Sequence, residues 1–354
     1  MAARQRIVEL NDRRRHGRRS QTVYVNAFIR STFSPLDVLS DEALIRKYRL
    51  NREVIQELCA LVQPHLVRAT RRNFALSPTV QLLAALRFYA SGSFFEVLGD
   101  GLGLSRSSIS RAVTAVTQVL LQLTARVTFP VGQAAIARVN EGFHTIAGIP
   151  RVIGAVDGTL IPIASPSENE PIYICRKGFA AVNVQVVCDH EGRFTDVVAK
   201  WPGSTHDSFM WANCGLRQVA EDGGFGGCWL LGDSGYPLRP FLLTPFLQAN
   251  TPAEVQYNIA HSRSRTVVER AIGVWKQRFR CLSKTAGGLQ LHPTKCCAIV
   301  VATAILHNMA VQANVQLPDD VVLMEEPDAD HLPADVHPAG VEARQQLLQH
   351  MFGP

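Results

Sequence analysis

The stretch VIGAVDGTLIPI, Val152–Ile163, is an apolar and largely β-branched run with a single acid, Asp157, near its centre. A run of this composition predicts a strand buried inside a sheet. A carboxylate in such a strand must be paired, hydrogen-bonded or bound to a cation, because burying an unpaired charge costs several kcal/mol. Asp157 is therefore the first candidate site residue.

More strands follow this one along the chain. The runs AAVNVQVVCD and FTDVVAKW, separated by residues 190–193, predict an antiparallel hairpin. The run CWLLGD predicts a further strand that ends on Asp233, and the helix HSRSRTVVERAIGVWKQRFRCL carries Glu269 among basic residues. The order of three strands, a helix, a strand and a later helix predicts a ribonuclease H-like sheet. In such a sheet the first and fourth strands are neighbours, so Asp157 and Asp233 would meet, with Glu269 placed over them.

Clustered carboxylates are the ligands that Mg²⁺ or Mn²⁺ prefers. Two such ions about 4 Å apart can activate a water or a 3′-hydroxyl and stabilise the leaving oxygen, so the pattern predicts phosphodiester cleavage. Each acid also has a structural alternative: a buried polar network for Asp157, the turn before Ser234 for Asp233, and a salt bridge to Arg265 or Arg270 for Glu269. The three acids in this order, with basic flanks, favour the site.

The chain from Leu50 to Ala147 has helical periodicity and few strand signals. The segment FFEVLGDGLGLSRSSISRAVTAVTQVLLQL predicts a short helix, a turn with three glycines and a long helix capped by Ser105, which is the helix-turn-helix pattern. A plain helical bundle with glycine turns is the alternative. Side chains suited to DNA phosphates and base edges stand at the start of the long helix: Arg106, Ser107, Ser108 and Arg111.

Charge is distributed unevenly along the 354 residues, whose net charge is +6. Residues 1–20 contain seven arginines and suit a polyanion, while residues 319–342 contain eight acids and neither lysine nor arginine. The basic segment could serve as a nuclear address or be a solvated leader. Four segments are therefore predicted: a basic arm at 1–40, a helical domain at 41–148, a nuclease domain at 149–314 and a flexible acidic tail at 315–354.

Several protein classes do not fit. The eight cysteines form no CxxC pair, which argues against a zinc ribbon or a secreted disulfide framework and favours the reducing cytosol or nucleus. No apolar run follows the charged N-terminus, so a signal peptide is not expected. The run Ala298–Ala310 falls short of the roughly 20 residues of a membrane span, so it is predicted to be a core helix and no membrane partner is expected.

From about Leu50 to Asn314 the chain resembles the Harbinger (PIF/Harbinger) transposases and the nuclease derived from them. The motifs that carry the resemblance are SPTVQLLAALRFYASGSF, GAVDGTLIPI, YICRKGFAAVNVQVVCD, WPGSTHDSFMW, WLLGDSGYPLRPFLLTPF, TPAEVQYNIAHSRSRTVVERAIGVWKQRFRCL and AILHNM. The resemblance implies a protein of α+β or α/β class, with a helical domain containing a helix-turn-helix before a ribonuclease H-like DDE nuclease domain. The metal-binding acids of the family correspond to Asp157, Asp207, Asp233 and Glu269.

The resemblance also implies a reaction and partners. Two Mg²⁺ or Mn²⁺ ions, with Asp157, Asp233 and Glu269 as catalytic acids, would support hydrolysis at the ends of a DNA element and attack of the freed 3′-hydroxyl on target DNA. A homodimer on double-stranded DNA, a Myb-like partner protein and a location in both nucleus and cytoplasm are expected. Cations that would neutralise DNA phosphates, or else form a solvated helix face, are Arg176, Lys177, Arg263, Arg265, Lys276 and Arg278.

Asp207 is expected to be an auxiliary acid, because it follows the third strand and begins a helix, where the alternative role is an N-cap. Two other functions have some support in the sequence. A domesticated descendant that binds DNA and its partner without cutting is compatible with the sequence. The motif GDSG around Ser234 is also found in chymotrypsin-like serine proteases, but the upstream half here is helical and the alanine-histidine-cysteine stretch of those enzymes is absent.

Overall fold

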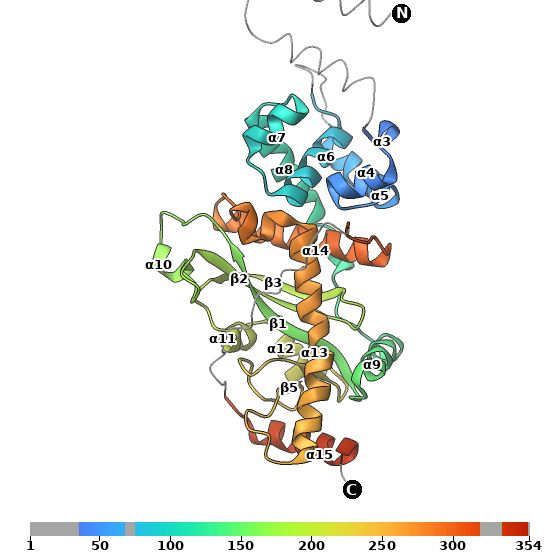
Figure 1. Ribbon diagram of the computed structural model, residues 1–354, viewed down its shortest axis with the longest axis vertical. Coiled ribbons are helices and arrows are strands. Elements are labelled where there is room, and N and C mark those ends of the chain that lie inside the picture. Colours follow the sequence, from blue (N-terminus) through green and yellow to red (C-terminus); the bar gives the residue numbers. More distant parts are fainter. Residues whose placement is uncertain (1–34, 68–74, 319–334, 353–354) are drawn as a thin grey trace, which may run out of the picture. The chain divides into compact units, whose positions relative to one another are not determined.

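The computed structural model describes residues 35–67, 75–318 and 335–352, and the chain divides into two compact units at residues 119 and 120 (Figure 1). Most of the predicted basic arm and the acidic stretch 319–334 lie outside the described residues. The described part of the first unit consists of helices: α3 (Pro35–Val38), α4 (Asp41–Tyr48), α5 (Arg52–Leu66), α6 (Pro78–Ser91), α7 (Phe95–Leu102) and α8 (Arg106–Leu120).

Local sequence signals explain where these helices begin and end. The side chain of Ser77 accepts a hydrogen bond from Val80 N and caps α6 as predicted, with proline in the first helical position. Helix α7 ends at Gly103, whose φ of 58° is the left-handed conformation that favours glycine. Ser105 Oγ then accepts from Ser108 N at 3.2 Å and caps α8. The predicted inner face of α8 is buried: Ile109, Val113, Val116 and Leu120.

A mixed five-stranded sheet forms the centre of the second unit, in the order β3-β2-β1-β4-β5. Strands β1 and β2 are antiparallel, as are β2 and β3, while β1, β4 and β5 are parallel neighbours. This confirms the predicted hairpin and the predicted contact between the first and fourth strands. The strands are β1 (Val152–Pro162), β2 (Ala181–Cys188), β3 (Phe194–Pro202), β4 (Trp229–Leu231) and β5 (Leu242–Leu243).

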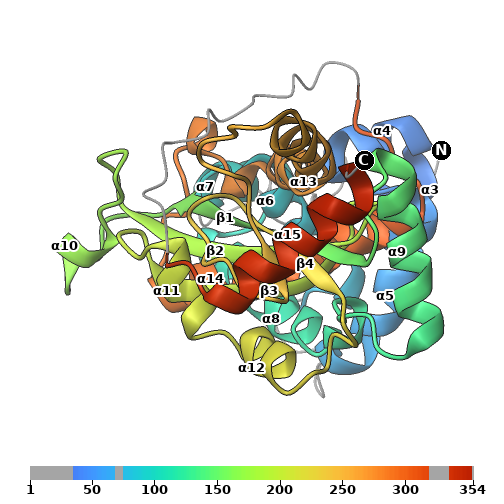
Figure 2. The same cartoon turned by 90° about the horizontal axis from the view of Figure 1, so that it is seen from below.

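Helices cover both faces of this sheet. Figure 2 shows α13 on one side of the sheet and α12 on the other. On the α11 and α12 side, Val156 of β1 and Leu230 of β4 pack with Trp211 and Tyr236 in one apolar cluster. The helices of this unit are η1 (Thr124–Arg126), α9 (Gln133–Ala147), α10 (Glu170–Tyr173), α11 (Asp207–Ala212), α12 (Gly215–Glu221), α13 (Pro252–Arg278), η2 (Arg280–Leu282), η3 (Lys284–Ala286), α14 (Pro293–Gln312) and α15 (Pro338–Phe352).

The predicted basic helix over residues 261–282 forms the later part of α13, which begins earlier, at Pro252, and ends at Arg278. Thr251 and Glu254 make a reciprocal capping box at its start, and Pro252 occupies the first helical position. The side chains of the predicted apolar stripe are buried along it: Val267, Val268, Ala271, Ile272, Trp275 and Phe279. The stripe fixes which face of α13 meets the sheet and therefore where Arg265 and Glu269 lie.

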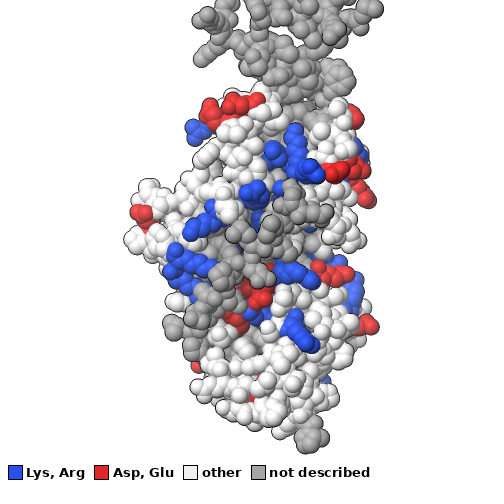
Figure 3. Space-filling view, viewed as in Figure 1, with Lys and Arg blue, Asp and Glu red and all other residues white. Residues whose placement is uncertain are grey.

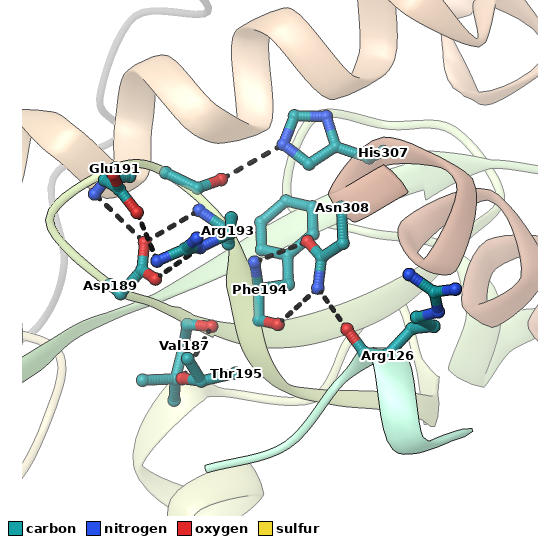
Figure 4. Close-up of polar contacts among 10 residues, drawn as sticks. Arg126, Val187, Asp189, Glu191, Arg193, Phe194, Thr195, His307 and Asn308 are labelled. Carbon is teal, nitrogen blue, oxygen red and sulfur yellow. Dashed lines mark hydrogen bonds and ion pairs between the residues drawn. The ribbon is translucent and has the colours of Figure 1, made fainter. Parts of the chain in front are cut away.

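Helix α14 fastens the β2–β3 hairpin through two neighbouring side chains (Figure 4). Asn308 Oδ1 accepts from Phe194 N at 2.8 Å, and Asn308 Nδ2 donates to Phe194 O and to Arg126 O, each at 2.7 Å. His307 Nε2 lies 3.1 Å from Gly192 O in the hairpin turn. The side chain of Asn308 thus replaces strand partners at this edge and holds β3, η1 and α14 together.

Two segment boundaries differ from the sequence prediction. Helix α9, predicted to close the helical domain, packs on β1 and α13 in the second unit, because Val139 and Phe143 bury its apolar face there. The C-terminal residues, predicted to be a flexible tail, include α15, which contacts α13 and β5. Arg344 of α15 donates to Thr244 O at 3.1 Å and to Pro245 O at 3.0 Å. The acidic, proline-containing stretch of sequence is thus followed by a helix that packs on the second unit.

Among the described residues, α14 is the one helix long and apolar enough to cross a membrane, and 67% of its most apolar window is buried inside the protein. This burial agrees with the core helix predicted from the run Ala298–Ala310. All eight cysteines are free, as the absence of paired spacings indicates.

Candidate active site

Asp157 lies in β1, and Asp233 lies two residues beyond the end of the parallel neighbour β4. Ala155 of β1 pairs with Leu231 of β4, and each acid stands two residues further along its chain. Since side chains alternate along strands and adjacent strands lie about 4.8 Å apart, the two carboxylates emerge side by side on one face. Each is buried and turned back onto its own backbone: Gly158 N donates to Asp157 Oδ1 at 2.9 Å, and Gly235 N donates to Asp233 Oδ1 at 3.0 Å.

Asp207 reaches the same region from the other face of the sheet. It is the first residue of α11, and a Cβ on Gly158 would lie only 2.4 Å from Asp207 Oδ1. Asn183 Nδ2 donates to Asp207 Oδ1 at 3.4 Å and to Thr205 O at 2.8 Å. The alternative role as an N-cap is wrong: His206 occupies the cap position, and the Asp207 carboxylate lies against β1.

Glu269 on α13 is linked to Asp157 through Arg265. Arg265 Nη2 forms an ion pair with Glu269 Oε1, one helical turn away, and Arg265 Nη1 lies 3.7 Å from Asp157 Oδ2. The salt bridge considered as the structural alternative for Glu269 is thus present, and it includes the first acid as well. One guanidinium therefore joins two of the predicted metal ligands.

The pKa values of Tyr236 and His261 are shifted by burial and by the charged side chains near them. Burial first, and then the nearby carboxylates of Asp207, Asp157 and Asp233, raise the pKa of the Tyr236 phenol well above its usual value. Burial also lowers the pKa of His261 to about 4, with a smaller lowering by Arg265 and an opposing effect of Asp233. Tyr236 therefore remains protonated, and His261 is a neutral ring whose Nε2 lies 3.1 Å from Leu243 O.

The carboxylates are chemically suited to a divalent metal, but in the structure they are not close enough together to coordinate one ion. In the part of the chain that the structure describes, no group of three or more His, Cys, Asp or Glu side chains is close enough to hold an ion. The donors are nevertheless carboxylate oxygens, which Mg²⁺ and Mn²⁺ prefer, and the charges of Asp157, Asp207 and Asp233 all act on the same phenol, that of Tyr236. The guanidinium of Arg265 lies between Asp157 and Glu269 and sets their separation.

The cations predicted to contact DNA fall into two groups. Arg176, Lys177 and Arg263 are exposed, and Figure 3 shows Lys and Arg side chains on either side of a small acidic patch near the middle of the second unit. Arg278 is only 2% exposed and donates from Nη2 to Val315 O at 2.7 Å, and Lys276 is also buried. The position of these last two in the core argues against a phosphate contact, because the inward stripe of α13 continues to the end of the helix.

The candidate residues of the first unit lie at the start of α8, as the cap at Ser105 requires. Arg106, Ser107 and Arg111 are exposed, and Ser108 is half-buried. Their contact with DNA stays a prediction.

Three residues near the acids were missed by the sequence reasoning: Gly158, Asn183 and Tyr236. Gly158 carried a usable signal, since a glycine inside a buried strand marks close approach by another group. Asn183 and Tyr236 carried none, because their relation to Asp207 arises only from the packing of α11 on the sheet.

Comparison with known proteins agrees with this architecture. Residues 156–308 match the family model described as DDE superfamily endonuclease. The protein "Putative nuclease HARBI1" of Bos taurus is 39% identical over 278 residues, which is 78% of this chain and 80% of that protein. The protein of the same name from Mus musculus is 40% identical over 277 residues, 78% of this chain and 79% of that protein. The chain belongs to the DDE superfamily endonucleases.

More distant relatives of this DDE endonuclease occur in plants. "Protein ALP1-like" of Arabidopsis thaliana is 26% identical over 311 residues, 80% of this chain and 74% of that protein. No solved structure matches. The region matched by the family model, residues 156–308, contains Asp157, Asp207, Asp233 and Glu269, so the four acids lie within the part of the chain that defines the family.

Proposed function

We propose that this chain is a divalent-metal-dependent DNA endonuclease in which Asp157, Asp233 and Glu269 hold the metal. The observation that carries the proposal is the pairing of β1 with β4, which sets Asp157 beside Asp233 at the point where α13 brings Glu269 and Arg265. The sheet order β3-β2-β1-β4-β5 also supports the ribonuclease H-like fold predicted from the sequence. The relatives named as nucleases support the same class of reaction.

The three acids would have different roles in binding the metal. Asp157 and Asp233 are held by backbone N–H groups on the rigid sheet and would bind the ions most directly. Glu269 is the most exposed of the three and would complete the site from α13. Two Mg²⁺ or Mn²⁺ ions bound there supply an activated water or 3′-hydroxyl and stabilise the leaving oxygen of a phosphodiester.

Asp207 and Tyr236 would support these acids. Asp207 lies against Gly158, the residue next to Asp157, and is positioned by Asn183. The buried phenol of Tyr236 stays protonated because burial and the charges of Asp207, Asp157 and Asp233 raise its pKa. Loss of such a supporting group lowers metal affinity or activity by about 10–100-fold.

We further propose the finer activity that the family resemblance implies: cleavage at the ends of a DNA element and joining of the 3′-hydroxyl to target DNA. The exposed side chains of Arg176, Lys177 and Arg263 would contact DNA phosphates near the acids. Arg265, which is paired with Asp157, would contact a phosphate at the acids themselves. The α7 and α8 pair would act as the helix-turn-helix, with contacts from Arg106, Ser107, Ser108 and Arg111.

We also propose an oligomeric state, a partner protein and a cellular location. A homodimer would process both ends of an element together, and a Myb-like partner would bring the protein to DNA. A location in nucleus and cytoplasm would follow. Co-precipitation of tagged chains, with and without DNA, tests the dimer, and fractionation of cells tests the location.

A second candidate function is DNA and partner binding without cleavage. The ion pairs of Arg265 with Asp157 and Glu269 favour it, because they already satisfy charge that a metal would otherwise neutralise. A chain that had lost catalysis but kept the ion pairs of Arg265 with Asp157 and Glu269 would still fold and bind DNA.

Plasmid cleavage in Mn²⁺ distinguishes the two functions. We expect the wild type to cut and Asp157→Asn to lose detectable cutting while it still binds DNA. Asp222→Asn, a change at an exposed acid of the same unit, should cut normally. Equal cutting by the wild type and Asp157→Asn would remove Asp157 from the site. Intact binding with no cutting by the wild type in any divalent metal would establish the second function.

The rank of Asp207 is tested in the same assay. Because Asp207 lies on the opposite face of the sheet and bonds to Asn183, Asp207→Asn should lower the cutting rate by about 10–100-fold, less than Asp157→Asn. Complete loss in both variants would make Asp207 an essential ligand instead of an auxiliary acid.

A further inference from the structure

We propose that Arg265 and the divalent ion compete for the same carboxylates, and that DNA relieves this competition by taking the guanidinium onto a phosphate. The inference rests on the proposed function, since it assumes that Asp157 and Glu269 bind the ion. Arg265 is then a positioning residue that couples metal loading to DNA binding.

The contacts of Arg265 are those of an internal counter-ion. Its two terminal nitrogens point to different acids, Nη1 to Asp157 Oδ2 and Nη2 to Glu269 Oε1. The side chains of Arg265 and Asp157 are 12% and 11% exposed, so water screens their attraction only in part. A divalent ion needs these same oxygens, and both cations cannot occupy one position between them.

His261 and two further arginines of α13 are the charged or polar neighbours that bear on Arg265. His261 lies one helical turn before Arg265 on α13, and burial keeps its ring neutral at physiological pH. Arg263 and Arg270 are exposed cations on α13 within five residues of Arg265. If the ion displaces Arg265, a DNA phosphate near Arg263 is an anion that can take its guanidinium, because phosphate oxygens accept two parallel N–H bonds from arginine.

Reciprocal coupling follows from this arrangement. DNA that withdraws Arg265 from the acids makes the carboxylates available, so it must raise the affinity for the ion. By linkage, the ion must raise the affinity for DNA by the same factor. A protein built in this way loads its metal mainly on DNA.

Binding of Mn²⁺ without DNA, measured from the electron paramagnetic resonance signal of free Mn²⁺, tests the competition. Arg265→Gln removes the competing charge, and we expect its Mn²⁺ affinity to exceed that of the wild type by about tenfold, the value of one partly screened ion pair. Arg270→Gln removes the same charge from an exposed position on the same helix and should change the affinity by less than about twofold.

A short DNA duplex supplies the second arm of the experiment. The duplex should tighten Mn²⁺ binding by about tenfold in the wild type and in Arg270→Gln, and by much less in Arg265→Gln. Arg265→Lys, whose single ammonium can hold only one carboxylate well, should fall between the wild type and Arg265→Gln, and it serves if Arg265→Gln fails to fold.

The outcomes separate this inference from the proposed function. Equal Mn²⁺ affinity in the wild type and Arg265→Gln, or no binding in either, overturns the competition. Equal enhancement by DNA in both overturns the coupling. If Asp157→Asn abolishes Mn²⁺ binding in both backgrounds, the proposed metal site stands whichever way Arg265 behaves. If Mn²⁺ binding survives Asp157→Asn, the metal lies elsewhere and the proposed site is wrong.

Discussion

Gly158→Ala would test whether the Asp207 carboxylate has to lie against β1 for the site to work. The added Cβ would stand 2.4 Å from Asp207 Oδ1 and 2.9 Å from its Cγ. Ordinary contact needs about 3.5 Å, so the carboxylate must move by about 1 Å. A displacement of that size at a reacting centre costs about 10²-fold in rate.

The effect on stability should be smaller than the effect on rate, because the clashing atoms are the end of one side chain. We expect a loss of about 1 kcal/mol, which lowers the melting temperature of a domain of this size by about 2–4 °C. The two measurements are Mn²⁺-dependent plasmid cutting and thermal unfolding followed by circular dichroism. The rate should fall sharply while the fold persists.

Two further variants make this test decisive. Gly215→Ala, where nothing lies within 4 Å of the added Cβ, should change neither the cutting rate nor the melting temperature. Asp207→Ala removes the atoms that clash, so adding Gly158→Ala to it should cost no more stability. A wild-type cutting rate for folded Gly158→Ala would refute the reasoning, because it would show that the place of Asp207 does not matter.

Three other predictions concern the fold and the DNA surface. Asn308→Leu removes three hydrogen bonds at 2.7–2.8 Å, two of them buried and one partly buried, so urea unfolding should show a loss of about 3 kcal/mol, at about 1 kcal/mol for each bond. For His261, burial lowers the pKa from 6.5 to about 4, so the unfolded chain binds this proton first as the pH falls. The stabilisation from the neutral ring is complete above pH 6.5 and is lost towards pH 4. His261→Gln should therefore flatten the decline of unfolding free energy over that range by up to about 3 kcal/mol, and an unchanged slope would contradict the assignment. Arg176→Ala and Lys177→Ala should each reduce the slope of log affinity for DNA against log salt by about 1, whereas unchanged slopes would place both cations away from the phosphates.

Strands β1 to β4 could be predicted because each signal is local, whereas the short strand β5 at Leu242–Leu243 was not predicted. The apolar run around Asp157, the hairpin before Phe194 and the acid that ends the run at Asp233 are each readable within about ten residues. The one non-local step, the contact of the first and fourth strands, followed from the order of elements and is confirmed by the pairing of Ala155 with Leu231.

Features that depend on tertiary packing could not be predicted. The sequence offers Glu269 two arginines as partners, and only the docking of α13 selects Arg265 and adds Asp157. Charge alone made Arg278 a candidate for DNA, but its position on the inward side of α13 buries it. Helix α15 was hidden because an acidic, proline-containing stretch precedes it, although its own residues have ordinary helical propensity.

The order in which the site residues leave the ribosome has a consequence for the cell. Asp157 is synthesised well before Asp233, and α13, with Arg265 and Glu269, emerges later still. Domains tend to fold as they are made, from the N-terminal end. Until α13 docks, the nascent chain has neither Glu269 nor the guanidinium that balances Asp157. A ribosome-bound fragment that lacks α13 therefore lacks part of the candidate site, which can assemble only after this helix has left the ribosome.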